Sequence, residues 1–282
     1  MKHRLIALAA VVALMVTACS SGDGTSGGAT ERPTPTASST PTPVPAMTFE
    51  VWFGYGEWLF VTARAEAARP RVAAAAVTAL LAGPSVEERA AGVGTSIPEG
   101  TELLGVSIER GLATVDLTPT FESGGGSLSM FNRLAQLTYT LTQFPTVRGV
   151  NLELDGKPVT VFSSEGIILD QPMTRRSYRD RLPPILVVRP QIGEQASSPI
   201  TISGTADVFE AVVSLGILDA HGDEIASTTT MATCGTGCRG AYSTSLTFAV
   251  DQDQRGTVRV FEVSAEDGRP VNVVDIPVVL LP

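Results

Sequence analysis

The stretch TFEVWFGY, residues 48–55, marks the start of the folded part of this chain of 282 residues. Its side chains Phe49, Val51, Phe53 and Tyr55 recur at every second position. That spacing is the period of a β-strand with one buried face. The stretch therefore predicts a sheet at the beginning of the first folded domain.

Two helices are predicted downstream of this strand. Residues 71–82 and 127–142 carry apolar side chains three and four positions apart, which places them on one face of a helix. The pairs Gly83-Pro84 and Phe144-Pro145 follow the two segments and are typical of a helix end.

Two hairpins complete the prediction for this domain. Residues 103–117 turn at Arg110-Gly111, and residues 150–162 turn at Asp155-Gly156. Together these segments predict an α+β domain over residues 47–163, with two helices on one small mixed sheet.

Residues 185–282 are predicted to form a second, all-β domain of the immunoglobulin-like sandwich type. Short extended segments separated by turns recur here without any helical periodicity. The predicted strands are 185–188, 200–204, 211–218, 225–230, 242–250, 257–264 and 271–280.

Residues 164–184 are predicted to be a linker, because turn residues and arginines dominate and two prolines end the segment. Arg175, Arg176, Arg179 and Arg181 form a basic cluster in it. The cluster can meet an anionic partner, but a solvated linker is the favoured interpretation.

The N-terminal region predicts export. A positively charged start precedes an apolar run over residues 5–16, which as a helix covers only about 18 Å of a bilayer core of about 30 Å. Residues 1–18 are therefore predicted to be a signal peptide.

Cys19, after small residues, resembles the lipobox of bacterial lipoproteins. The resemblance implies lipid on Cys19 and anchoring at the outer face of the cytoplasmic membrane. An ordinary secreted protein is the alternative.

Residues 19–46 are predicted to be a disordered stalk. Ser, Gly, Thr and Pro dominate this segment, and it has too few large apolar residues to bury a core.

In an exported chain, Cys234 and Cys238 are expected to form a disulfide, since both lie in a short glycine-containing loop. A redox or zinc site is the alternative, but zinc needs more ligands than two cysteines.

No catalytic or cofactor motif stands out in the sequence, so we expect no enzyme, no cofactor and no metal. The histidines are His3, in the predicted signal peptide, and His221, in a predicted turn. Asp251 and Glu262 sit at EF-hand spacing, but Arg255 replaces an oxygen ligand. The net charge of -9 argues against nucleic acid as a partner.

Several separated segments resemble known families. ALLAGP (79–84), TSIPEGT (95–101), ATVDL (113–117) and LTYTLTQFP (137–145) resemble the GerMN domain of sporulation and spore-germination proteins, which also occurs in actinobacterial envelope lipoproteins. SGTA (203–206), VFE (208–210) and EDG (266–268) resemble Gmad2, an immunoglobulin-like domain associated with germination proteins.

The resemblance implies a non-catalytic, membrane-anchored envelope lipoprotein that acts as a protein-interaction or assembly module, with an envelope protein as its partner. Tyr139, Thr142 and Gln143 lie off the apolar stripe of their helix and are predicted to face outward as an interaction surface. Asp116 and Thr118 are predicted to cap a strand end. The alternatives are a lipoprotein that binds peptidoglycan or a small ligand, and a cell-wall hydrolase using paired carboxylates such as Glu87 and Glu88.

Overall fold

The computed structural model describes residues 46–68 and 70–282, which belong to one compact unit. The predicted signal peptide, Cys19 and all of the predicted stalk except Ala46 lie outside the described residues. Among the described helices, none is long and apolar enough to cross a membrane.

The first sheet is built on a long hairpin. Strand β1 (Ala46–Tyr55) pairs along its whole length with β2 (Trp58–Ala67). On its other edge, β1 pairs only at Gly54 and Tyr55, with the short strand β3 (Val93–Gly94). The rest of this β1 edge therefore needs other hydrogen-bond partners.

The second sheet has the order β4-β5-β6-β7. Strand β5 is antiparallel to β4 and parallel to β6. A small two-stranded sheet, β8 with β9, follows in the chain. The bounds are β4 (Leu103–Glu109), β5 (Leu112–Leu117), β6 (Gly149–Leu154), β7 (Lys157–Pro158), β8 (Val161–Phe162) and β9 (Ile167–Ile168).

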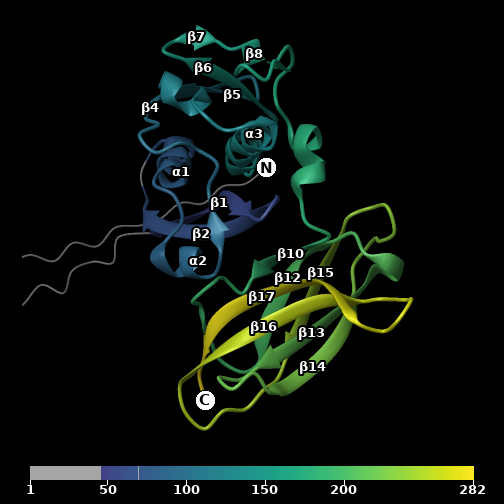
Figure 1. Cartoon of the computed structure of the whole chain (residues 1–282). Helices are drawn as coiled ribbons and strands as arrows, with labels where there is room; N and C mark the ends of the chain where they lie inside the picture. The colour runs from purple at the N-terminus through teal and green to yellow at the C-terminus, as the bar shows by residue number, and fades with distance from the viewer. Residues whose placement is uncertain (1–45, 69) are drawn as a thin grey trace, which may run out of the picture. The chain divides into compact units, whose positions relative to one another are not determined.

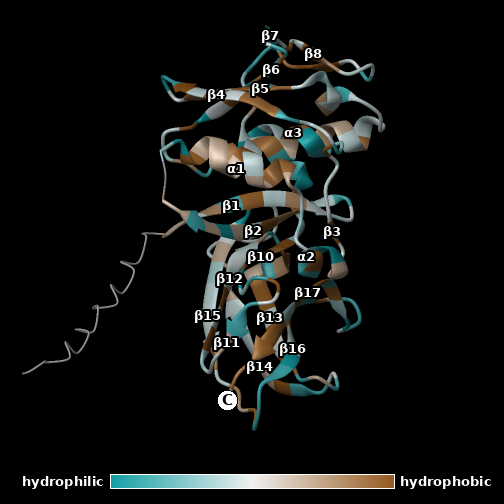
Figure 2. Ribbon diagram, turned by 90° about the vertical axis from the view of Figure 1, so that its left-hand side faces the viewer, coloured by the Kyte–Doolittle hydropathy of each residue, from teal (hydrophilic) through white to brown (hydrophobic). Residues whose placement is uncertain are grey.

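Helices α1 and α3 lie between the two sheets, as Figure 2 shows. The bounds are α1 (Val72–Leu81), α2 (Val86–Ala90) and α3 (Ser127–Leu141), with a 3-10 turn η1 (Pro119–Glu122) before α3. Helix α3 contacts β1 on one side and β6 on the other. The prediction of two helices on one small sheet is therefore wrong: α1 contacts β1 and β4, and α3 contacts β1 and β6, so each of these helices packs against both sheets.

The predicted linker is ordered and packed. It contains β9 and the 3-10 segment η2 (Arg175–Arg181), which contacts α3. Met173 and Val150 each donate a backbone N–H to the other's carbonyl, at 2.8 and 2.9 Å. The side chains of Met173 and Tyr178 are buried. Residues 164–184 thus differ from a solvated linker, because two large side chains tie them to the first domain.

The C-terminal region is β-rich and consists of two sheets, whose strands other than β11 are labelled in Figure 1. Each of the seven predicted strands is present within residues 185–282, and the short β11 was not predicted. One sheet has the order β10-β12-β15 and the other β11-β17-β16-β13-β14. The bounds are β10 (Ile185–Arg189), β11 (Gln195–Ala196), β12 (Ile200–Ala206), β13 (Val212–Leu218), β14 (Glu224–Met231), β15 (Gly240–Leu246), β16 (Gln254–Val263) and β17 (Pro270–Leu280).

Both sheets of this region bury apolar side chains. Ile202 and Tyr242 of the smaller sheet are buried, as are Leu215, Val260 and Ile276 of the larger one. This burial provides the hydrophobic stabilisation of the region.

A buried carboxylate holds the first sheet to α2. Glu88 is only 4% exposed and accepts hydrogen bonds from both terminal nitrogens of Arg64, at 2.7 and 2.6 Å. Thr62 Oγ1 and the Ser85 N–H also donate to it, at 2.5 and 2.7 Å. Burial alone would raise the pKa of Glu88, but these hydrogen bonds and the Arg64 charge hold it below its ordinary value.

We expect Glu88→Gln to lower the free energy of unfolding by about 2–4 kcal/mol at pH 7, because the amide must turn an NH₂ group toward an N–H donor. The folded pKa is lowered, so the ionised carboxylate stabilises the fold above its unfolded pKa of about 4.3 and loses this effect as pH falls. Urea unfolding at pH 7, 4 and 3 should therefore show that the difference in unfolding free energy between the wild type and Glu88→Gln becomes smaller as pH falls below about 4.3. Glu99→Gln, at an exposed turn, is the control. An equal difference at all three pH values would contradict this account.

Candidate functional site

Polar side chains of α3 and of the turn that follows it, where Gln143 lies, bind the edge of β1 that β3 leaves unpaired. Gln143 Oε1 accepts the Glu50 N–H at 2.6 Å, and its Nε2 donates to the Glu50 carbonyl at 2.6 Å. Thr140 Oγ1 accepts the Trp52 N–H at 3.1 Å, and Gln136 Nε2 donates to the Trp52 carbonyl at 3.2 Å. Helix α3 and this turn thus supply the hydrogen bonds that a neighbouring strand would make.

The predicted outward surface of Tyr139, Thr142 and Gln143 is not what the structure shows. Tyr139 is 2% exposed, and its ring centroid lies 4.7 Å from that of Trp52. Thr142 and Gln143 are half-buried. The polar atoms of these residues face inward because the backbone of β1 and the side chain of Arg175 need them as partners.

Arg175, the first residue of η2, covers this aromatic pair. Its guanidinium lies 5.3 Å from the ring centroid of Trp52 and 4.8 Å from that of Tyr139. Its Nε donates to Thr142 Oγ1 at 3.0 Å, and an Nη atom lies 3.8 Å from a Glu50 carboxylate oxygen. Burial lowers the pKa of Arg175, while the Glu50 charge opposes that shift. The guanidinium nevertheless remains charged at neutral pH.

A second arginine reaches the same place from the C-terminal region. Cys234 and Cys238 form a disulfide with a Cα–Cα distance of 5.7 Å. Arg239 follows this loop, and its guanidinium donates to the carbonyls of Pro183 and Thr205. Burial lowers the pKa of Arg239, and the nearby Asp207 charge opposes the shift.

These arginines line a cavity of about 510 Å³, which we call the arginine groove and define by Arg175, Arg176, Arg179 and Arg239. Glu50 is the acidic residue that lines it. Arg176 and Arg179 are exposed, and their side chains make no ion pair or hydrogen bond with any residue in the described part of the chain.

Sequence reasoning found only part of this groove. It grouped Arg181 with the other arginines of η2, but Arg181 pairs with Asp180 at 3.0 Å and does not line the cavity. It missed Arg239 and Glu50, which are far from η2 in the chain. No local pattern marks these two residues as neighbours.

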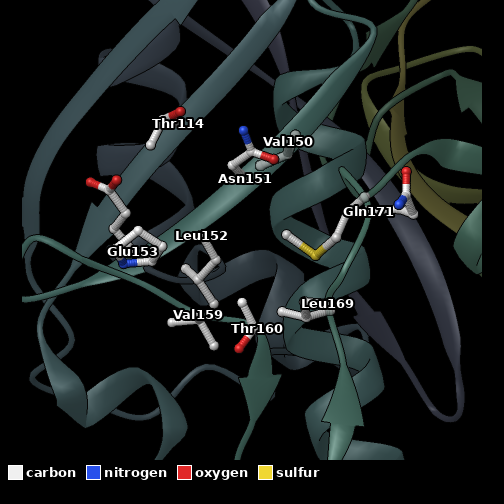
Figure 3. A pocket seen from close by; sticks show the side chains of 11 residues that line it. Thr114, Val150, Asn151, Leu152, Glu153, Val159, Thr160, Leu169 and Gln171 are labelled. Atoms are coloured by element: carbon white, nitrogen blue, oxygen red, sulfur yellow. The ribbon is translucent and has the colours of Figure 1, made fainter.

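A second hollow, of about 190 Å³, lies along β5 and β6. Figure 3 shows Leu152, Val159 and Leu169 gathered at one part of it, with Glu153 and Thr114 beside the strands. Glu153 is the charged group in its lining. With one carboxylate and no Lys, Arg, His, Cys or Ser in that lining, we assign the hollow no chemistry.

Other candidate residues from the sequence serve turns. Asp116 Oδ1 accepts the Gly156 N–H at 2.9 Å, and Thr118 Oγ1 accepts the Glu102 N–H at 3.0 Å. Asp219 accepts the backbone N–H of His221 at 2.8 Å. Within residues 46–68 and 70–282, no group of three or more His, Cys, Asp and Glu side chains lies close enough to hold a metal ion.

Two families match consecutive parts of the chain. Residues 55–160 match Germane, described as "Sporulation and spore germination". Residues 184–269 match Gmad2, described as "Immunoglobulin-like domain of bacterial spore germination". No curated protein matches the sequence.

Solved structures with a weaker likeness include two of the sporulation protein GerM from Bacillus subtilis. The first GerMN domain has 18% identity and a TM-score of 0.37, covering 46% of this chain and 98% of that one. The tandem GerMN domains have 14% identity and a TM-score of 0.40, covering 65% of this chain and 59% of that one.

We expect Arg175→Met to lower the free energy of unfolding by about 1–2 kcal/mol, because methionine retains apolar contact but loses the charge over two aromatic rings. Urea unfolding followed by tryptophan emission measures the change. Arg176→Met removes the same charge from the neighbouring, exposed position and should have little effect. An equal loss in both variants would contradict the assigned role of Arg175.

Proposed function

We propose that this chain, which carries a GerMN-like domain followed by a Gmad2 domain, is a non-catalytic, membrane-anchored envelope lipoprotein that serves as an assembly module. Its relation to GerM-type sporulation and germination proteins supports the proposal. In this proposal, Cys19 carries the lipid and the stalk separates the folded unit from the membrane. A disulfide between Cys234 and Cys238 is consistent with an exported protein.

We also propose that the C-terminal region is an immunoglobulin-like sandwich. Its two sheets each bury apolar side chains, and the Gmad2 family description names this domain type. Sandwiches of this kind commonly present loops and sheet faces to partners.

An exposed apolar patch supports a role in binding another protein. We define the apolar patch as Phe209, Val212, Met231 and Val263, of which Phe209 is 52% and Met231 68% exposed. Val212 and Met231 are direct partners on β13 and β14, so they point to the same face. The Phe209 N–H donates to the Glu262 side chain, which places the backbone of Phe209 near the end of β16.

This patch is the observation that carries the proposal. Large apolar side chains grouped on adjacent strands are typical of protein-interaction surfaces, whereas single exposed apolar residues are common everywhere. A partner that covers Phe209 and Met231 would remove both from water and gain hydrophobic stabilisation.

The test is crosslinking and affinity capture of the anchored protein from its native host, comparing the wild type with a Phe209→Ser, Met231→Glu double variant. We expect recovery of the same envelope proteins to fall at least fivefold in the double variant, because a carboxylate replaces an apolar contact. Cys19→Ala should release the protein from the membrane and also reduce recovery.

The matched control is Val86→Glu with Ile108→Ser, which changes two exposed apolar residues of the first domain. All variants should retain the wild-type melting temperature. Unchanged recovery in the patch variant, or recovery of peptidoglycan fragments without protein, would contradict the assembly role.

A further inference from the structure

The arginine groove has a charge imbalance that its own contacts do not remove. Four arginines and one carboxylate, that of Glu50, line the groove, while the whole chain has a net charge of -9. Positive charge is therefore concentrated at this place against the overall sign of the protein. Two other acids lie near the groove but outside its lining: Asp207 accepts the Gly237 N–H at 2.8 Å, and Asp180 pairs with Arg181.

The four arginines divide into a fixed pair and a free pair. Arg175 is held over two rings, and Arg239 is held by the Pro183 and Thr205 carbonyls. Burial lowers the pKa of both, since each cation has lost part of its hydration. Arg176 and Arg179 are exposed and free to move toward a ligand.

The chemistry of the lining favours a phosphate group. The planar guanidinium fork matches the oxygens of carboxylate and phosphate groups, and several guanidinium groups together can surround the oxygens of one tetrahedral phosphate. Arg175 already covers Trp52 and Tyr139, which are both nearly buried, so neither ring offers a free face for stacking. Recognition must therefore depend on charge and hydrogen bonds.

The volume of the cavity limits the size of the ligand that it can hold. A volume of about 510 Å³ exceeds what a lone ion fills and lies within the range of small-molecule sites, about 300–1,000 Å³. We propose that the arginine groove binds a phosphate-bearing ligand of about the size of glycerol phosphate or a sugar phosphate. A soluble phosphoester and a lipid headgroup share this chemistry.

The test measures binding to the full chain carrying Cys19→Ala. Calorimetry with glycerol 3-phosphate, inorganic phosphate, malate and glycerol tests the soluble source. Sedimentation with phosphatidylglycerol vesicles, against phosphatidylcholine vesicles, tests the lipid source. We expect a phosphate-bearing probe to bind, malate to bind more weakly and glycerol not to bind.

The decisive variant is Arg176→Gln with Arg179→Gln, which removes the free pair without touching the buried contacts. We expect it to weaken binding at least tenfold. Arg110→Gln with Arg255→Gln removes the same charge from exposed positions elsewhere and should weaken binding less than twofold. Melting temperatures of both double variants establish that the fold is retained.

The outcomes distinguish a soluble phosphoester from a lipid headgroup as the source of the phosphate, and they also show whether the groove binds phosphate at all. Groove-dependent binding of glycerol 3-phosphate supports a soluble ligand, and groove-dependent binding of phosphatidylglycerol vesicles alone supports a lipid headgroup. The proposal is overturned if no phosphate-bearing probe binds at millimolar concentration, if malate binds as tightly as glycerol 3-phosphate, or if both double variants lose affinity equally. None of these outcomes depends on the assembly role.

Discussion

The hydrogen bonds between α3 and the edge of β1 are the constraint on which the rest of the first domain depends. Strand β1 has a full partner in β2 but only a two-residue partner in β3 on its other edge. Buried backbone groups without partners are costly, so the edge requires donors and acceptors. Gln136, Thr140 and Gln143 provide them and thereby fix the position of α3 on the sheet.

The position of α3 then determines the candidate site. With α3 held on β1, Tyr139 packs on Trp52, and the pair forms the surface that Arg175 covers. A side-chain amide also binds the outer edge of β2, where Gln191 Oε1 accepts the Ala63 N–H at 2.9 Å. Gln191 belongs to the C-terminal region, so amide side chains bind both edges of the β1–β2 hairpin.

Local patterns in the sequence predicted the strands and helices better than they predicted which residues of other elements each side chain contacts. Alternation predicted β1 and the strands of the C-terminal region, and apolar spacing predicted α1 and α3, because these signals come from neighbouring residues. The inward direction of Tyr139 and Gln143 was missed, since their partners are on β1, about 90 residues earlier. Arg239 joins the groove only through the fold, and the packing of Met173 turned a predicted linker into part of the first domain.

Side chains of α3 and of the turn after it take the place of a neighbouring strand at the edge of β1. Native-state hydrogen exchange at the amides of Glu50 and Trp52 tests it most directly, since their hydrogen bonds go to Gln143 and Thr140 side chains. Both amides should exchange as slowly as those of Val51 and Phe53 in the same strand. Exchange as fast as that of an unpaired strand edge would contradict it.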